Sequence, residues 1–206
     1  MDSELDFEQV YAAYQLPIHS YLARLTGSKE SEDLTQEVFI KVGEALKSFR
    51  NESQVSTWIY RIATNVAIDR MRSRSFNHKA AEIYDVSEVD LNSNNERSGK
   101  RQRSIEEQVV RQEMNECIQA CIETLSEKYR IVLVLSEMEG FKKSEIAAIL
   151  GLSIDAVKIR LHRAREKLKS ALTEHCNFYR TECCGRLACE PKISIAKIKA
   201  IAAKKH

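Results

Sequence analysis

Helical periodicity covers most of this chain, and a single polar stretch interrupts it. Apolar residues recur at helical spacing from Phe7 to Phe49, from Trp58 to Arg74 and from Ile105 to about His175. Between Phe76 and Ser104 the pattern stops and polar side chains predominate, as is typical of a flexible linker. With 2 prolines and 6 glycines, the chain has too few turn residues for a β-sandwich or barrel. The sequence therefore predicts an all-α protein.

The expected organisation is two small helical domains joined by a flexible linker. We expect a first domain at 1–75, the linker at 76–107, a second domain at 108–174 and a Cys-rich, Lys-rich tail at 175–206. The apolar run Ile131–Leu135 is far shorter than the ~20 residues of a membrane span. The acidic start of the chain is unlike a signal peptide. These features predict a cytoplasmic protein whose six cysteines stay reduced as thiols.

Charge is segregated along the chain, although the net charge is only +2. Residues 1–52 contain ten acidic and five basic side chains, whereas residues 153–170 contain six Lys or Arg and two acidic side chains. The end of the chain, from Pro191, has five lysines and no acidic residue. This separation indicates two partners of different charge.

The segment Ser31–Lys47 is predicted to be a helix with Ser31 as its N-cap and with two distinct faces. The apolar face contains Leu34, Val38, Val42, Ala45 and Leu46. The opposite face is polar and acidic except for one isoleucine, and contains Asp33, Gln36, Glu37, Ile40 and Glu44. Either this is a solvated face with a stray isoleucine, or it docks a basic partner helix with Ile40 at its dry centre.

A second candidate face lies on the helix that contains Trp58. Its core stripe is predicted to be Trp58, Ile59, Ile62, Ala63 and Val66. Arg61, Asn65 and Arg72 share another face. Cations near a helix end suit the helix dipole, but they also suit contacts to phosphates, with Asn65 and the aromatic ring of Phe49 holding an unstacked base.

The region around Gly151 is typical of a helix-turn-helix. Residues 142–152 are predicted to form a short helix with inward Ile146, Ala147 and Leu150. Gly151 suits a left-handed C-terminal cap and Ser153 suits the N-cap of the next helix. The core of that second helix is predicted to be Ile154, Val157, Leu161, Ala164 and Leu168. Its other face is basic, with Lys158, Ile159, His162, Arg163 and Arg165, which favours DNA binding over a merely solvated helix.

Both halves of the chain resemble one family, the extracytoplasmic-function (group IV) sigma factors of bacterial RNA polymerase, within the sigma-70 family. Residues 33–42 resemble the clamp-binding helix of region two, and residues 48–50 and 57–65 resemble its promoter-melting segment. Residues 125–130, 139–141, 145–151 and 157–165 resemble region four. One departure is Lys142–Ser144, where many members have a Ser N-cap.

The resemblance implies a non-enzymatic protein that binds core polymerase, recognises the −35 and −10 promoter elements and helps to melt DNA, in a stress or metal response. It implies that the clamp of the largest polymerase subunit is bound by Asp33, Gln36, Glu37 and Ile40. It implies that the −10 element is bound by Phe49, Arg61, Asn65 and Arg72. It implies that the −35 element is read by Lys158, Ile159, His162 and Arg163, with Arg160 and Arg165 on the DNA backbone. Further partners would be the polymerase flap and an anti-sigma factor. No small-molecule substrate and no cofactor would be required.

The tail has an unusual concentration of cysteine. A zinc or copper(I) site there would draw its ligands from His175, Cys176, Cys183, Cys184 and Cys189. The spacing is not that of a standard zinc motif, so inert thiols are an equal alternative. The tail has few apolar residues and is not expected to fold without a metal. Cys117 and Cys121 are predicted to be buried core residues.

Two other function classes remain open from the sequence. A DNA-binding repressor or activator would use the same helix-turn-helix, but it would not need the acidic docking face. A protein that is primarily a metal sensor would depend on the tail alone. An enzyme lacks support, because the chain has no nucleophile–base set and no phosphate-binding loop.

Overall fold

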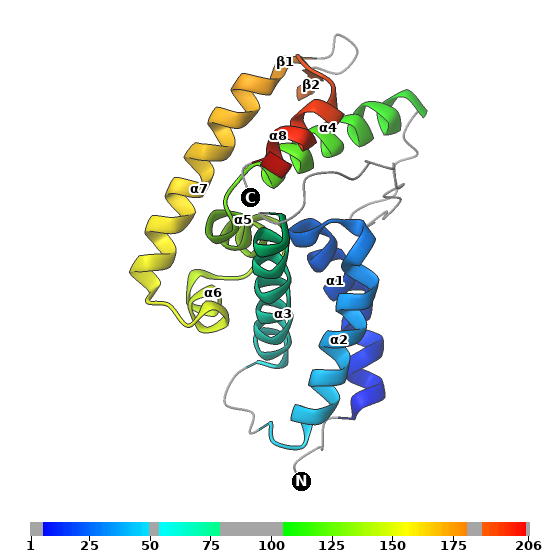
Figure 1. The fold of residues 1–206 in the computed structure, drawn as a ribbon, viewed down its shortest axis with the longest axis vertical. Coiled ribbons are helices and arrows are strands. Elements are labelled where there is room, and N and C mark those ends of the chain that lie inside the picture. Colours follow the sequence, from blue (N-terminus) through cyan, green and yellow to red (C-terminus); the bar gives the residue numbers. More distant parts are fainter. Residues whose placement is uncertain (1–5, 50–53, 79–104, 181–186, 205–206) are drawn as a thin grey trace. The chain divides into compact units, whose positions relative to one another are not determined.

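The computed structural model describes residues 6–49, 54–78, 105–180 and 187–204, and helices dominate it (Figure 1). The all-α prediction is confirmed, with one departure, a two-stranded sheet near the C-terminus. The chain divides into two compact units. The first takes residues 1–93 and 131–159, and the second takes residues 94–130 and 160–206. No helix among the described residues is long and apolar enough to cross a membrane.

Three long helices form the body of the first unit. They are α1 (Phe7–Thr26), α2 (Ser28–Leu46) and α3 (Val55–His78), and each packs against the other two (Figure 1, blue to teal). The Asp6 carboxylate caps α1 by accepting a hydrogen bond from the Glu8 N–H at 3.4 Å. Each helix contributes buried apolar side chains to the core: Ile18, Tyr21, Leu22, Leu25, Leu34, Val38, Val42, Ile59, Ala63 and Val66.

A single residue, Gly27, separates α1 from α2. Its φ of +90° lies where side chains are rarely tolerated, and its N–H donates to the Ala23 carbonyl at 3.0 Å. The helix α2 therefore begins at Ser28, and the predicted N-cap role of Ser31 is wrong. Ser31 is fully buried inside α2, and its Oγ lies 3.0 Å from Nε2 of His19.

The chain returns to the first unit within α5 (Glu127–Leu133), at residue 131. A π-helical turn, η1 (Val134–Met138), packs against α1, and α6 (Lys143–Leu150) packs against α3. The start of α6 lacks a Ser cap, but the Glu145 carboxylate accepts a hydrogen bond from the Lys142 N–H at 2.7 Å, which supplies one of the two hydrogen bonds of a capping box.

The turn after α6 contains the two predicted helix caps, one at Gly151 and one at Ser153. Gly151 ends the helix in the left-handed conformation, with φ +62°. Ser153 then caps α7 (Ile154–His175), because its Oγ accepts a hydrogen bond from the Ala156 N–H at 3.1 Å. Both cap predictions are confirmed.

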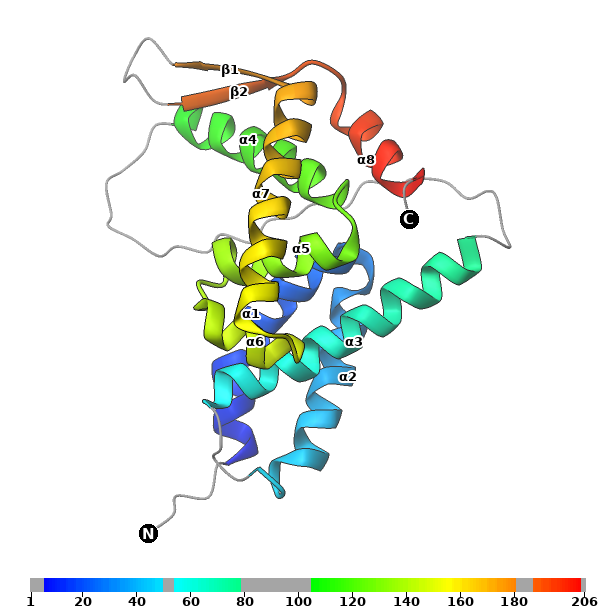
Figure 2. The same cartoon turned by 90° about the vertical axis from the view of Figure 1, so that its left-hand side faces the viewer.

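The second unit contains α4 (Ile105–Glu123), β1 (Cys176–Arg180), β2 (Leu187–Pro191) and α8 (Ile195–Lys204). The strands pair antiparallel, with Cys176 opposite Pro191 and Phe178 opposite Cys189. Both β2 and α8 pack against α4 (Figure 2). Their shared core consists of Cys117, Ala120, Cys121, Cys176, Cys189 and Ile198, with Met114, Leu168, Ala171, Leu172, Ile193 and Ile195 around it.

The tail therefore has regular structure, contrary to expectation. Ile195, Ile198 and Ala202 follow helical spacing, and Ile198 is fully buried. Thus α8 has an apolar face, and α4 covers it. This face is not evident from the tail alone, because the residues that cover it belong to α4, far away in the sequence.

Candidate protein and nucleic-acid interfaces

The acidic face of α2 is exposed to solvent. Leu34, Val38 and Val42 point into the core, as predicted. The side chains on the other face are all exposed: Asp33, Gln36, Glu37, Ile40 and Glu44. Ile40 has an exposed fraction of 63%, so its side chain adds little to the folded core.

Ion pairs along α2 leave this face largely negative. Lys41 Nζ lies 3.5 Å from Oε1 of Glu37, one helical turn away, and both side chains are about half exposed. Arg70 Nε donates to Oε2 of Glu30 at 2.8 Å, which joins the start of α2 to α3. Asp33 and Glu44 remain exposed beside Ile40. A partner with cations around an apolar centre would match this surface.

On α3, the three polar residues predicted to share a face are all exposed. Arg61, Asn65 and Arg72 recur at helical spacing and lie outside the core. The predicted core stripe is buried at Ile59, Ala63 and Val66, while Trp58 and Ile62 are only half-buried.

Phe49, the aromatic residue predicted for this site, comes before α3 in the chain. Its ring is half-buried and its centroid lies 4.8 Å from that of Trp58, with the planes tilted by 41°. This packing attaches Phe49 to the start of α3.

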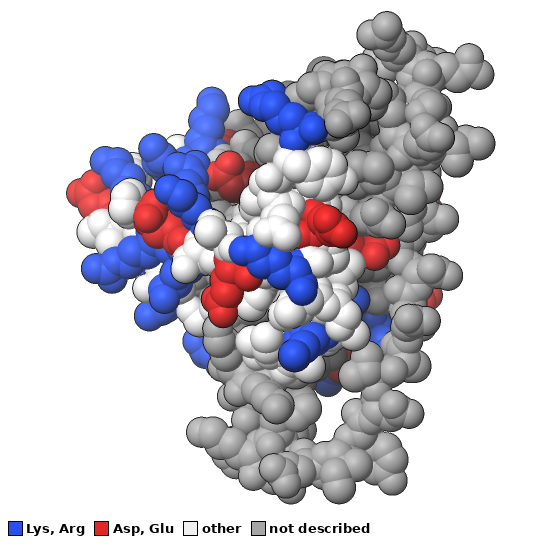
Figure 3. All heavy atoms as spheres, turned by 90° about the horizontal axis from the view of Figure 1, so that it is seen from above, with Lys and Arg blue, Asp and Glu red and all other residues white. Residues whose placement is uncertain are grey.

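The basic residues of α7 lie on its solvent side. Lys158, His162, Arg163 and Arg165 are exposed, Ile159 has an exposed fraction of 53%, and Arg160 is half-buried. Lys158 Nζ also pairs with Oδ1 of Asp155 at 2.9 Å. Lys and Arg side chains gather on the left of Figure 3, where α7 lies in Figure 1.

The predicted core of α7 holds except at its first residue. Val157, Leu161 and Ala164 are buried and Leu168 is half-buried, whereas Ile154 has an exposed fraction of 46%. Ile154 lies about 60° around the helix from Val157, at ~100° per residue. It therefore lies at the edge of the buried stripe. Because Ile154 is the first residue of α7, no preceding turn of the helix covers its side chain.

A buried polar network in the first unit was not foreseen. Glu139 Oε1 accepts a hydrogen bond from Arg24 Nη1 at 2.8 Å, and Oε2 accepts one from Tyr60 Oη at 2.6 Å. The Tyr60 ring meets the Phe141 ring edge-on at 4.7 Å. Burial, then the Glu139 charge, raises the pKa of Tyr60 well above its usual range. Local sequence patterns do not predict this network, because Glu139 lies 79 residues from Tyr60 and 115 residues from Arg24 in the chain.

Tyr21 extends the network into α1. Its Oη lies 2.8 Å from Oγ1 of Thr64, and its ring centroid is 5.0 Å from that of Tyr60. Burial is the main cause that raises the pKa of Tyr21 far above its usual range.

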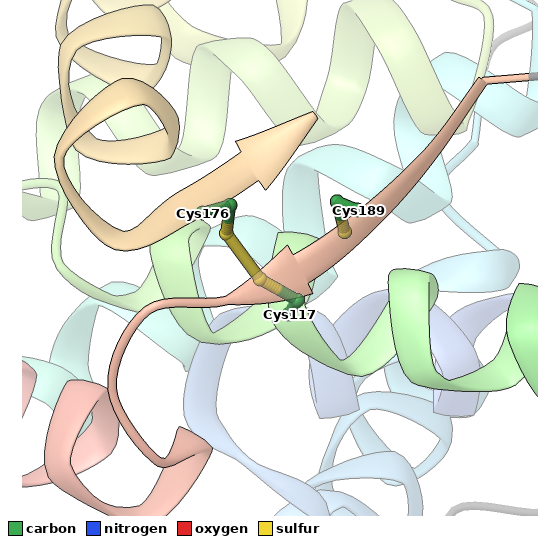
Figure 4. A group of neighbouring side chains, drawn as sticks. All are labelled: Cys117, Cys176 and Cys189. Carbon is green, nitrogen blue, oxygen red and sulfur yellow. A yellow bond between two sulfur atoms is a disulfide. The ribbon is translucent and has the colours of Figure 1, made fainter. Parts of the chain in front are cut away.

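The cysteines that the structure brings together differ from the predicted set. Cys176 and Cys189 meet Cys117 of α4, and Cys117 and Cys176 form a disulfide (Figure 4). The expectation that all six cysteines are thiols is thus wrong for this pair. Cys183 and Cys184 lie outside the described residues, and His175 is buried at the end of α7. Cys121 is also buried, and burial, followed by the nearby Cys189, raises its pKa to about 11.

Comparisons with known proteins agree with this arrangement of helices. The family model for sigma-70 region 2 matches residues 10–76, and that for sigma-70 region 4 matches residues 115–168. The ECF RNA polymerase sigma factor SigW of Bacillus subtilis is 34% identical over 170 residues, covering 82% of this chain and 89% of SigW. The chain belongs to the sigma-70 family. Sigma factors are transcription initiation factors, so the family to which this chain belongs acts in initiation.

Two further comparisons extend the likeness of this sigma factor. The ECF RNA polymerase sigma-E factor of Escherichia coli K12 is 32% identical over 165 residues, covering 79% of this chain and 84% of that protein. The fold is similar to that of the sigma factor RpoE solved with the anti-sigma factor NepR from Bartonella quintana. The TM-score is 0.63 at 23% identity, and the match covers 82% of this chain and 97% of that one.

Proposed function

We propose that this sigma factor directs core RNA polymerase to promoters of a stress or metal response, as a member of the extracytoplasmic-function (group IV) subclass. The observation that carries the proposal is a pair of solvent-exposed faces of opposite charge. The acidic face of α2 surrounds Ile40, and the basic face of α7 surrounds Ile159. A transcription factor that binds DNA alone needs only the second of these faces.

The acidic face of α2 docks the clamp of the largest polymerase subunit. Asp33 and Glu37 attract a basic helix of the clamp, Gln36 adds a hydrogen-bonding group, and Ile40 supplies the apolar centre. The exposure of all four side chains supports this role.

The exposed face of α3 holds the melted −10 element. Arg61 and Arg72 contact phosphates, while Asn65 and Phe49 receive a base that has left the stack. The packing of Phe49 on Trp58 supports this role, because it orders the aromatic ring before DNA arrives.

The helix α7 lies in the major groove of the −35 element. Lys158, Ile159, His162 and Arg163 read base edges and the thymine methyl, whereas Arg160 and Arg165 contact the backbone. The left-handed Gly151 turn and the Ser153 cap support this assignment, because they set the start of the helix that enters the groove.

The partners we propose are core polymerase, through its clamp and flap, promoter DNA and an anti-sigma factor. Two solved structures support the last of these partners: RpoE is bound to the anti-sigma factor NepR, and CnrH is bound to the cytosolic domain of CnrY. The CnrH match has a TM-score of 0.55 at 23% identity, covering 82% of this chain and 88% of CnrH. The domain boundaries predicted above, with region two at 1–75 and region four at 108–174, remain part of this proposal.

The decisive experiment is run-off transcription from a genomic fragment library, with purified core polymerase, in the presence and absence of this protein. We expect transcripts from a limited set of fragments that share two elements, and none from core polymerase alone. Transcription of no fragment, together with no binding to core polymerase, would overturn the proposal.

A further inference from the structure

Three sulfur atoms from distant parts of the chain meet in the core of the second unit. The Sγ atoms of Cys117, Cys176 and Cys189 all lie within 4.8 Å of one another, and all three residues are buried (Figure 4). They come from α4, from the first residue of β1 and from β2, so a bond through this point would join three elements. No other group of this kind occurs among the described residues.

A fourth thiol, that of Cys121, belongs to the same core cluster as the three. Cys121 is one helical turn after Cys117 on α4, so their side chains share a face. Cys121 is buried in the same cluster, and its thiol interacts electrostatically with Cys189. Two cysteines of one helix and two cysteines of a hairpin thus share one buried core, and together they supply the number of ligands that a tetrahedral ion needs.

The backbone spacing also suits a bound ion. Cys117 and Cys176 form a disulfide, but their Cα atoms are 7.7 Å apart, and disulfides usually span about 4.4–6.8 Å between Cα atoms. Thiolates that share a zinc ion, each at ~2.3 Å from it, keep their sulfurs about 3.8 Å apart and so allow a wider backbone separation. The cluster is therefore spaced for sulfurs that meet through a metal.

The surroundings favour a structural ion over an exposed catalytic one. Apolar side chains pack around the cysteines, including Met114, Leu172 and Ile195. Such a shell keeps water and competing ligands away from the sulfurs, and four protein ligands leave no open position.

We propose that the reduced protein binds one Zn²⁺ through Cys117, Cys121, Cys176 and Cys189. A thiol reductant first opens the disulfide, so that two protein thiols form while the reductant is oxidised to its own disulfide. The four thiols then lose four protons as the zinc–sulfur bonds form. The site ties β1 and β2 to α4 and holds the tail on region four. It differs from the tail site expected from sequence, because it uses two residues of α4 and neither Cys183 nor Cys184.

The test uses the full chain, freed of metal with a chelator under reducing conditions and then titrated with Zn²⁺ and with Co²⁺. We expect one ion per chain, and the visible spectrum of tetrahedral Co²⁺ with thiolate charge-transfer bands. X-ray absorption of the zinc-loaded wild type should give four sulfur neighbours at ~2.3 Å. This readout does not depend on any variant folding correctly, or on transcription.

Variants then assign the ligands. Cys117→Ser, Cys176→Ser and Cys189→Ser should each weaken zinc binding at least 100-fold, since even second-shell losses cost about 10–100-fold. Cys121→Ser should do the same, and the double variant Cys183→Ser/Cys184→Ser is the matched control that should bind zinc normally. Absence of zinc binding by the wild type, or loss of zinc from the control variant, would each overturn the site. Zinc binding lost in His175→Ala but kept in Cys121→Ser would overturn the choice of the fourth ligand.

Discussion

Arg24 Nη1 donates to Glu139 Oε1 at 2.8 Å, although the two residues are 115 positions apart in the chain. Arg24 belongs to the region two match, and Glu139 belongs to the region four match. The Glu139 side chain is only 9% exposed, and its second oxygen accepts the Tyr60 hydroxyl. Within the first unit, one carboxylate thus joins residues of both matched regions of the sigma factor.

Replacing this carboxylate should destabilise the first unit. Glu139→Gln removes the charge that faces Arg24 and weakens the bond from Tyr60, so we expect a loss of about 1–3 kcal/mol in the free energy of unfolding. Urea denaturation measures it. The exposed Glu137→Gln, two residues away in η1, is the control and should change the free energy by less than about 0.5 kcal/mol. Equal effects of the two substitutions would show that the network contributes nothing specific.

The buried tyrosines predict a loss of stability at alkaline pH. Their raised pKa values keep Tyr21 and Tyr60 protonated in the folded chain at pH values where the unfolded chain ionises, above about 10. The folded state then binds more protons, so the free energy of unfolding falls as pH rises beyond that point, by up to ~1.4 kcal/mol per pH unit for each tyrosine. Urea denaturation at a series of pH values from 9 to 12 measures the slope.

Substitution identifies the groups responsible for that slope. The double variant Tyr21→Phe/Tyr60→Phe should be less stable at neutral pH, because it loses two hydrogen bonds, but it should show a flatter decline above pH 10. Tyr11→Phe, at an exposed position of α1, should keep the wild-type slope. A slope unchanged in the double variant would assign the alkaline decline to other groups.

Ile40→Glu should weaken binding to core polymerase without weakening the fold. The side chain is largely exposed, so the folded chain loses little, whereas an interface that needs an apolar centre loses about 1–2 kcal/mol, or about 5–30-fold in affinity. A binding titration with labelled core polymerase measures this. Leu16→Glu, at an exposed apolar position of α1, should keep wild-type affinity. Undiminished affinity in the Ile40 variant would remove the docking role of α2.

Two arginines of α7 should have separable effects on DNA binding. Arg163→Ala should relax the base preference at one position of the −35 element, at a cost of about 1–3 kcal/mol. Arg160→Ala should weaken binding to all promoter sequences alike and reduce the salt dependence. Binding to a panel of single-base promoter variants at several salt concentrations distinguishes the two. If both substitutions weaken every promoter equally, the division between base reading and backbone contact is wrong.

Local signals predicted much of the fold and of the candidate faces. The Gly151 turn, the Ser153 cap and the two faces of α2 depend on residues within one or two helical turns, and the structure contains all of them. Features that depend on distant residues were missed. Cys117 looked like an ordinary core residue, because Cys176 lies 59 positions further along the chain. The β1–β2 hairpin is not predicted by the sequence, because each strand has only five residues. Such strands are too short to show a clear alternation of apolar and polar residues.

The glycine between α1 and α2 makes the direction of the acidic face of α2 depend on the backbone conformation of a single residue. At φ +90° and ψ 159°, Gly27 has the mirror image of a conformation that ordinary residues adopt readily, and nothing lies within 4 Å of an added Cβ. An L-residue at this position would turn α2, and with it Asp33 and Ile40, away from its present course. A D-alanine introduced by chemical synthesis would fit and would hold the two helices more firmly. The orientation of the acidic face of α2 thus depends on the handedness of one position that has no side chain.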